Sequence, residues 1–369
     1  MTSPVLHVRG KVLVGPHEVH DELWVVGGRI TYAAPSAGAD VQTVDGWVLP
    51  GLVDAHAHLA IGQGAPEELP DAARSRAAAR ADLDAGVLLV REPGSPNRAS
   101  TGIGPDHGLP RVQTSGRFLA GVGCYLPGFA QEVTDDELPD AALRELAAGT
   151  GWVKAIGDWR GDSGEGWVLG FAPDALAVAV RVVHDAGGRF AIHAIGPEAV
   201  EAAIAAGPDS IEHATYATDH HFEAMAAAGI AVTPTLNALL MARKMTEQRG
   251  ASPEELARID EGIAGLPARV RTAHEAGVTL MAGTDAALPH GQVWREIVSL
   301  AAAGIPNDAA LAAGSWAARS FLGLPGIEEG APADLVAFDR DPRESLEVLA
   351  TPSVIVLDGR VIERMPADV

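Results

Sequence analysis

Cysteine and lysine are the residue types that this sequence has least of. Its 369 residues include one cysteine, Cys124, and three lysines, Lys11, Lys154 and Lys244, which leaves 24 arginines among the 27 basic residues. A single cysteine cannot form an internal disulfide bond or build a thiolate metal site, and it is typical of a reducing compartment. Any metal ion would have to be held by histidines, carboxylates or a less usual ligand.

Positive charge and long apolar runs are also scarce. The chain has 27 Lys and Arg residues against 49 Asp and Glu residues, a formal net charge of -22. A surface this negative repels phosphate groups and anionic lipids, so we expect no nucleic acid partner and no membrane partner. No run of about 18 or more apolar residues is present, and residues 1–12 lack the basic and apolar parts of a signal peptide. The sequence predicts a cytoplasmic protein, monomer or homo-oligomer, whose partner is a small-molecule substrate.

Both ends of the chain are rich in short β-strand patterns. Hydrophobic residues make up 47% of the sequence and charged residues 21%, which is ordinary for a globular protein. Apolar, β-branched segments fill the first fifty residues and return near the other end, with tight turns expected at Gly27-Gly28 and Asp358-Gly359. Because neither end has enough strands to bury a core alone, we predict that residues 1–50 and 331–369 form one small β-sandwich domain.

The middle of the chain, residues 51–330, alternates short apolar segments with Ala-rich amphipathic ones. Helices are expected at 173–187, 197–206 and 221–228, each closed or followed by glycine. Strands are expected at 47–58, 87–92, 111–116, 152–157, 190–194, 210–214, 230–235 and 278–285. Strands that are apolar on both faces belong in a helix-covered sheet, and eight such units in roughly 270 residues match a (β/α)8 TIM barrel. A doubly wound sheet is the alternative, but no GxGxxG or GxxxxGK[ST] motif follows any of these strands.

Histidines and one aspartate stand where the predicted strands end. His56 and His58 are two residues apart, so they point to the same side of their strand. His193, His213 and Asp285 each follow the apolar segment of a later strand. In a barrel of this kind the carboxyl ends of all strands meet at one face, which carries the active site. The five side chains together form a nitrogen and oxygen ligand set suited to Zn2+ or a similar divalent ion.

Lys154 stands inside the apolar segment Gly-Trp-Val-Lys-Ala-Ile-Gly. A buried ammonium without a partner is costly. Three outcomes are open: the pKa of the amine shifts, the amine pairs with a carboxylate such as Asp54 or Asp285, or it is chemically modified.

These motifs, in this order, resemble the amidohydrolase superfamily. The likeness rests on LPGLVDAHAHL, the interior lysine, HAIG, SIEHAT and AGTD, and the tail from PHGQVWREI through GIEEGAPADLVAFDRDPRE to VLDGRVIE resembles the imidazolonepropionase-like and prolidase-like branch. The resemblance implies a centre of two divalent metal ions, with Zn2+ expected. A carbamate formed from CO2 and Lys154 would bridge the two ions. One ion would be held by His56, His58 and Asp285, and the other by His193 and His213.

The resemblance also implies a metal-dependent hydrolase that cleaves an amide, peptide-like or ester or lactone bond of a small molecule. A hydroxide bridging the metals would attack, and Asp285 would be the catalytic proton shuttle. Tyr125, Trp159, Arg160 and His290 lie on loops at the predicted barrel mouth, where they either bind substrate or pack. Branch members that cleave dipeptides often carry a histidine in a Gly-rich loop after the third strand, whereas this chain reads AGVGCYLPGF there.

Two other functions compete with this interpretation. A mononuclear deaminase or imidazolone-type cyclic amidohydrolase uses a glutamate soon after the fifth-strand histidine, but the first carboxylate after His193 is Glu198. A catalytically inactive barrel that acts as a structural subunit would lack metal ligands, and none of the expected ones is missing from the sequence.

Overall fold

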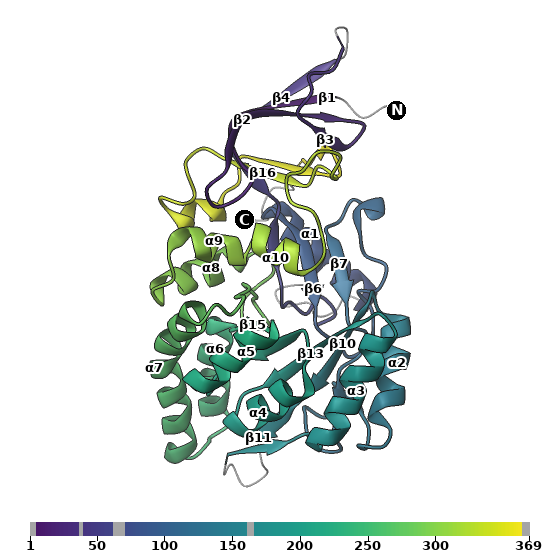
Figure 1. Ribbon diagram of the computed structural model, residues 1–369, viewed down its shortest axis with the longest axis vertical. Helices are drawn as coiled ribbons and strands as arrows, with labels where there is room; N and C mark the ends of the chain where they lie inside the picture. The colour runs from purple at the N-terminus through teal and green to yellow at the C-terminus, as the bar shows by residue number, and fades with distance from the viewer. Residues whose placement is uncertain (1–4, 37–39, 62–70, 161–165, 364–369) are drawn as a thin grey trace.

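The computed structural model describes residues 5–36, 40–61, 71–160 and 166–363. Figure 1 shows a sheet of strands from both ends of the chain at one end of the molecule, and a larger body of strands and surrounding helices below it. The strands are β1 (Val5–Leu13), β2 (Val19–Val26), β3 (Arg29–Thr31), β4 (Val41–Pro50), β5 (Leu52–Asp54), β6 (Val87–Glu92), β7 (Arg111–Thr114), β8 (Leu119–Ala120), β9 (Gln131–Glu132), β10 (Trp152–Ile156), β11 (Asp158–Arg160), β12 (Trp167–Leu169), β13 (Arg189–Ala194), β14 (Ser210–His213), β15 (Ala231–Thr233), β16 (Leu335–Phe338), β17 (Val354–Leu357) and β18 (Arg360–Val361). The helices are α1 (Asp71–Asp84), α2 (Leu138–Ala148), α3 (Pro173–Asp185), α4 (Pro197–Ala206), α5 (Asp219–Ala228), α6 (Leu236–Gln248), α7 (Pro253–Glu275), α8 (Val293–Ala302), α9 (Asn307–Ala313) and α10 (Trp316–Phe321).

The two ends of the chain meet in one seven-stranded sheet. Its order is β18-β17-β16-β4-β1-β2-β3, so β4 from the beginning of the chain lies beside β16 from its end. Strands β16 and β4 pair antiparallel, with Leu335 opposite Pro50 and Phe338 opposite Trp47. Residues of β1 alternate between buried and more exposed over its first half, as expected for a strand with one face on a core.

The sheet curls until the turns near its two edges touch. The turn at Gly27-Gly28 has positive φ at both residues, and so has the turn at Asp358-Gly359. A Cβ atom on Gly359 would lie 2.3 Å from the Cα of Gly28, so the contact requires glycine. Apolar side chains from both chain ends, with Ile327, fill the space that the curled sheet encloses. The β-sandwich and the boundaries at residues 50 and 331 stay predictions.

Parallel strands and helices alternate through the middle of the chain. The strands form a sheet of order β5-β6-β7 and a sheet of order β15-β14-β13-β10-β8-β9. All residues of β5, β6, β10, β14 and β15 are buried, as the apolar patterns predict for strands covered on both faces. In Figure 1, helices α2 to α5 and α7 lie outside these strands. The helix expected at 197–206 has those bounds as α4, and Gly207 ends it in the left-handed conformation.

The segment 278–285, expected to be the eighth strand, contains only isolated bridges. Leu280 pairs with Val232, and Asp285 pairs with Ala57. The Ala55 N–H also donates to the carbonyl of Ala282 at 2.9 Å, so this segment lies between β15 and β5. Near the end of this segment, the Thr284 N–H donates to the side-chain carboxylate of Asp54 and not to a backbone carbonyl, which interrupts a regular ladder. The closed (β/α)8 barrel stays a prediction.

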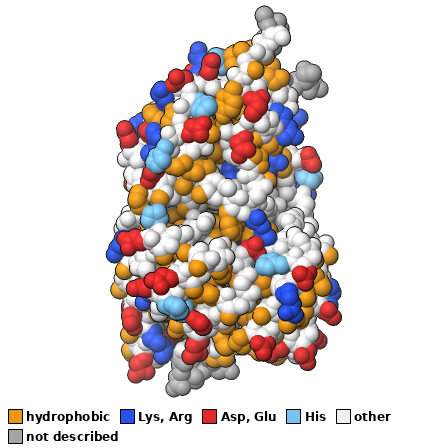
Figure 2. Space-filling model, in the orientation of Figure 1, with side chains coloured by type: hydrophobic (Ala, Val, Ile, Leu, Met, Phe, Trp, Pro, Cys, Tyr) orange, Lys and Arg blue, Asp and Glu red, His pale blue; other side chains and the backbone are white. Residues whose placement is uncertain are grey.

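The surface reflects the acidic composition. Figure 2 shows Asp and Glu side chains spread over the visible face, with Lys and Arg side chains between them and apolar side chains exposed in small groups. Among the described residues, no helix combines the length and the apolar character that a membrane span needs. The cytoplasmic location stays a prediction.

Candidate metal centre

His56, His58 and Asp285 meet at the end of β5. One ligand atom from each of the three side chains lies within 4.8 Å of the other two. The backbone brings them together, because Ala57 pairs with Asp285 in a parallel bridge and the Asp285 N–H donates to the His56 carbonyl at 2.6 Å. Strand β5 ends at Asp54, short of the strand end expected at residue 58, so both histidines lie in the segment that follows it. Both imidazoles still face Asp285. The rings of His56 and His58 are 5.1 Å apart and nearly perpendicular.

The hydrogen bonds of the two imidazoles leave their outer nitrogens as acceptors. Nδ1 of His58 is 3.0 Å from the carbonyl oxygen of Gly94, and a carbonyl only accepts, so Nδ1 carries the proton. Nδ1 of His56 likewise faces the Glu212 carboxylate at 2.7 Å. Each Nε2 therefore carries a lone pair in the neutral ring. Those atoms lie 3.1 Å (His58) and 3.7 Å (His56) from the same carboxylate oxygen of Asp285. A metal ion or a proton on one imidazole would relieve the repulsion among three facing acceptors, so these residues fit a metal ion.

A buried ion pair supports His56 from behind. The Arg91 guanidinium is fully buried and donates to Glu212 at 2.7 Å, to Ser210 at 2.8 Å and to the backbone carbonyl of Ala55 at 2.6 Å. Burial alone would raise the pKa of Glu212, but Arg91 and the bond to His56 hold that pKa well below its usual range. An ionised Glu212 fixes the His56 proton on Nδ1 and so directs Nε2 toward the centre.

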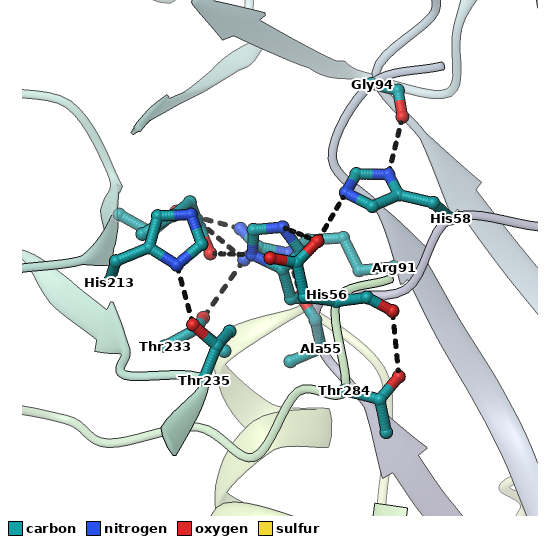
Figure 3. Close-up of polar contacts among 12 residues, drawn as sticks. Ala55, His56, His58, Arg91, Gly94, His213, Thr233, Thr235 and Thr284 are labelled. Carbon is teal, nitrogen blue, oxygen red and sulfur yellow. Dashed lines mark hydrogen bonds and ion pairs between the residues drawn. The ribbon is translucent and has the colours of Figure 1, made fainter. Parts of the chain in front are cut away.

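His193 and His213 extend the cluster on the other side of His56. The rings of His56 and His213 are 5.2 Å apart, and those of His213 and His193 are 4.6 Å apart. In Figure 3, His56 lies between His58 and His213, and those two side chains bond to Gly94 and Thr235 respectively. The bond from His213 Nδ1 to the Thr235 hydroxyl is 2.6 Å long. Nε2 of His193 is buried and has no hydrogen-bond partner within the described part of the chain.

Burial keeps these imidazoles neutral. It lowers the pKa of His56 to about 4 and the pKa of His213 to about 3, and it lowers the pKa of His193 well below its ordinary value. At pH 7 the three rings therefore have lone pairs to offer. That is the protonation state in which histidine binds metal.

Lys154 lies in the middle of β10 with 1% of its surface exposed. Burial lowers the pKa of its amine to about 8; Arg91 adds to this, while the charge of Glu212 opposes it. Among the described residues, no carboxylate forms an ion pair with this amine. Asp54 is bonded instead by the Thr284 hydroxyl at 2.6 Å and by backbone N–H groups. The structure thus lacks the ion pair with Asp54 or Asp285 that was one of the three outcomes open for Lys154.

Three of the four predicted substrate residues lie together beside the cluster. The rings of Tyr125 and Trp159 are 4.7 Å apart, Trp159 is 6.2 Å from His193, and the Arg160 guanidinium lies 5.6 Å over the Trp159 ring. Phe118 continues this aromatic wall from Tyr125 toward His58. Burial, followed by the negative charge of Asp285, raises the pKa of Tyr125. The wall therefore reaches from one group of predicted ligands to the other.

His290, the fourth residue, has different neighbours. Its Nδ1 atom lies 3.1 Å from the Asp82 carboxylate on α1, and Asp82 also accepts the N–H of Gly291 at 2.6 Å. Burial alone would lower the pKa of His290, but the charge and hydrogen bond of Asp82 raise it. These contacts pack the segment after residue 289 against α1. A contact between His290 and substrate stays a prediction.

Sequence reasoning missed the residues behind the ligands. Arg91 and Glu212 are the clearest examples, because both are charged and fully buried. A signal existed for each: Arg91 ends an otherwise apolar strand segment, and Glu212 immediately precedes a predicted ligand. Asp158 on β11 is also buried and was missed; burial raises the pKa of its carboxyl to about 7.

Comparison with known proteins places this geometry in a family. An uncharacterized protein of Mycobacterium tuberculosis is 39% identical over 362 residues, which is 96% of this chain and 95% of that protein. The solved structure of an Xaa-Pro dipeptidase with bound methionine has a TM-score of 0.84 at 24% identity, covering 97% of this chain and 100% of that one. Ochratoxinase of Aspergillus niger is 29% identical over 191 residues, 50% of this chain and 39% of its own. Its crystal structure has a TM-score of 0.82 at 20% identity, covering 98% and 96% of the two chains.

The solved structures show an amidohydrolase-type α/β fold. The amidohydrolase family itself matches residues 47–362 and so confirms the family that the motifs predict. This chain belongs to the amidohydrolase family and is a hydrolase acting on amide or related C–N bonds.

Proposed function

We propose that this protein is a metal-dependent hydrolase that cleaves an amide, peptide-like or ester or lactone bond of a small molecule. The observation that carries the proposal is the meeting of three acceptors, the Nε2 atoms of His56 and His58 and the Asp285 carboxylate, at distances that suit a shared cation. His56, His58 and Asp285 would hold one divalent ion, and His193 and His213 would hold a second. Zn2+ is the first candidate, because it favours imidazole and carboxylate ligands.

Lys154 would complete the centre as a carbamate. The neutral amine attacks CO2, a bond forms between Nζ and carbon, and one proton leaves, which yields an anionic pair of oxygens. With a pKa of about 8, roughly a tenth of the amine is neutral at pH 7, so the reaction does not need an alkaline solution. Carboxylation also removes a buried positive charge that has no ion-pair partner among the described residues. The product would lie between the two groups of histidines and bridge the ions.

Bound divalent ions polarise a scissile carbonyl and lower the pKa of water. Asp285 would then serve as the proton shuttle. Its side chain accepts the backbone N–H of Ala286 at 2.7 Å, which holds the carboxylate in place beside the two histidines. From there it would take a proton from the attacking water and pass it to the leaving amine.

The substrate would lie against the aromatic wall of Phe118, Tyr125 and Trp159, with Arg160 stacked on its outer part. Aromatic side chains bind apolar groups, and a guanidinium binds an anionic one. The likeness to an Xaa-Pro dipeptidase favours a peptide-like amide over an ester or a lactone. The acidic surface in Figure 2 supports a small-molecule partner over nucleic acid or membrane.

The deaminase alternative gains no support from the structure. Glu198 is exposed in the first turn of α4, and within the part of the chain that the structure describes it forms no hydrogen bond or ion pair with His193. An inactive structural subunit would not need an aromatic wall beside neutral, convergent imidazoles.

Metal analysis of the purified protein, combined with a panel of dipeptides, N-acyl amino acids, lactones and aryl esters, tests the proposal. We expect two equivalents of metal and turnover of one substrate class. Lys154→Ala should lower the metal content and remove most activity, and a short carboxylate such as acetate should restore part of both. A Lys154→Ala variant that keeps two metal ions per chain and near-normal turnover would contradict the bridging role.

A further inference from the structure

Strands β10 and β13 separate immediately after the predicted ligands that they carry. The two strands are parallel, with Lys154 opposite Ala191 and Ile156 opposite His193. One more backbone bond follows, from the Gly157 N–H to the His193 carbonyl at 2.8 Å. Beyond this bond, β10 continues into β11, and β13 continues into α4. Backbone pairing with β10 therefore ends at His193, whereas on the other side of β13 the N–H groups of Ala214 and Tyr216 still donate to the carbonyls of Ala194 and Ile195, both at 3.0 Å.

The side chain of Asp158 continues the connection beyond that point. Its two carboxylate oxygens accept the backbone N–H groups of Ile195 at 3.0 Å and of Gly196 at 2.7 Å. Gly196 is the N-cap residue of α4 and has no side chain to cap the helix itself. A carboxylate is favoured at this position because it satisfies free N–H groups and faces the positive end of the helix dipole. Asp158 is fully buried, so these two hydrogen bonds are shielded from water.

The same carboxylate lies next to His193 without bonding to it. The distance from Asp158 Oδ1 to His193 Nε2 is 3.7 Å, beyond hydrogen-bond reach. This Nε2 atom is the buried nitrogen that has no partner within the described chain. The hydrogen bonds from the two backbone N–H groups hold the Asp158 carboxyl at this distance. Nε2 of His193 therefore stays free to meet another partner.

We propose that Asp158 is a positioning residue that holds the loop after β13 so that His193 offers Nε2 to a metal ion. The inference rests on the proposed function, in which His193 is a metal ligand. The positioning role differs from a purely structural role as a helix cap, because it requires Asp158 to change metal affinity by way of His193.

Asp158→Asn in the full-length, metal-loaded protein tests the inference. The amide keeps the size of the side chain but presents an NH2 group to one of two backbone N–H donors, so one bond is lost. We expect one of the two metal ions to bind about 10–100-fold more weakly in a chelator competition, with the other ion retained. If Asp158→Asn does not fold, Asp158→Glu replaces it. That variant keeps the charge, but its longer side chain displaces both bonds, and we expect the same selective loss.

Asp209→Asn is the matched control. Asp209 stands at the opposite end of β13, where it accepts the Phe190 N–H at 2.8 Å and contacts His184 at 2.9 Å. Loss of this bond should lower the melting temperature of the metal-free protein without changing metal affinity. In a His193→Ala background, Asp158→Asn should have no further effect on metal affinity, because both changes act on one ligand.

The outcomes separate the inference from the function on which it rests. A wild-type protein that binds two ions, together with an Asp158→Asn variant that binds both with unchanged affinity, overturns the positioning role alone. An additive loss in the His193→Ala background also overturns it, since Asp158 would then act by another route. A wild-type protein that binds no metal refutes the proposed function and the inference with it.

Discussion

Replacing Lys154 by methionine should stabilise the metal-free protein at neutral pH, although it destroys the proposed bridging group. Methionine has a similar length and no charge, so it fits the same buried position on β10. The lysine carries a cost there because burial lowers its pKa from 10.5 to about 8. That difference, at about 1.4 kcal/mol for each pKa unit, corresponds to about 3 kcal/mol of stability lost at pH 7. Imperfect packing of the new side chain offsets part of this, so we expect a gain of about 1–3 kcal/mol.

The pH dependence gives the prediction its sign. The unfolded chain keeps the lysine proton up to a pH near 10.5, whereas the folded chain releases it near pH 8. The cost is therefore fully present below pH 8, falls between pH 8 and 10.5, and is absent above that range. Lys154→Met has no such contribution. The stability difference between the two proteins should shrink steadily across this window.

Urea unfolding at several pH values between 7 and 10 measures the effect, after chelation of metal and removal of CO2. Lys11→Met is the control, because Lys11 is exposed and paired with Asp21 at 2.7 Å, and its loss should change stability little at any pH. A Lys154→Met protein that is less stable than wild type by about 3–5 kcal/mol at pH 7 would refute the reasoning. That result would mean that a buried carboxylate depends on the lysine as its ion-pair partner.

Three further predictions concern the same centre. Glu212→Gln removes the charge that fixes the proton of His56, so metal affinity measured by chelator competition should fall about 10–100-fold, and an unchanged affinity would contradict this orienting role. Gly283→Ala places a Cβ atom 2.6 Å from side-chain atoms of both His56 and Thr233; calorimetry should show a loss of about 1–3 kcal/mol, and metal content should fall with it. Activation of the metal-free enzyme by Zn2+ at constant dissolved CO2 should accelerate from pH 7 to 9, as Lys154 loses its proton, and a rate independent of pH would argue against carboxylation.

The candidate ligands were accessible from sequence because their signals are local. A spacing of two residues predicts that His56 and His58 point to the same side, and a polar residue at the end of an apolar segment marks a strand end. The supporting residues depend on which strands are neighbours. Glu212 on β14 bonds to His56, which lies 156 positions away along the chain, and Arg91 on β6 bonds to Glu212. Nothing in either local segment specifies that meeting.

The fold was predictable to a similar depth. Strong periodic segments such as α4 have their expected bounds, whereas the apolar segments on the two sides of Gly10 form one strand, β1. Gly10 joins them through an irregularity at positive φ, where a Cβ atom would lie 2.2 Å from the Gly46 carbonyl oxygen. A glycine inside a strand pattern suggests either a break or a bulge. The partner strands decide between them, because β1 pairs with β4 without interruption and shifts its register against β2.

The backbone at the centre shows why local rules stop short of the site. His213, Thr235 and Asp285 all have positive φ, a conformation that is costly for residues other than glycine and especially for β-branched threonine. Each such residue costs of order 1–3 kcal/mol and persists only where surrounding contacts hold it. Those contacts are present, since His213 bonds to Thr235 and the Asp285 N–H bonds to the His56 carbonyl, both at 2.6 Å. The left-handed residues lie at the end of β14, two residues after β15, and at the bridge between Ala57 and Asp285. Propensities assign these residues to other conformations, so local rules do not predict the turns that shape the centre.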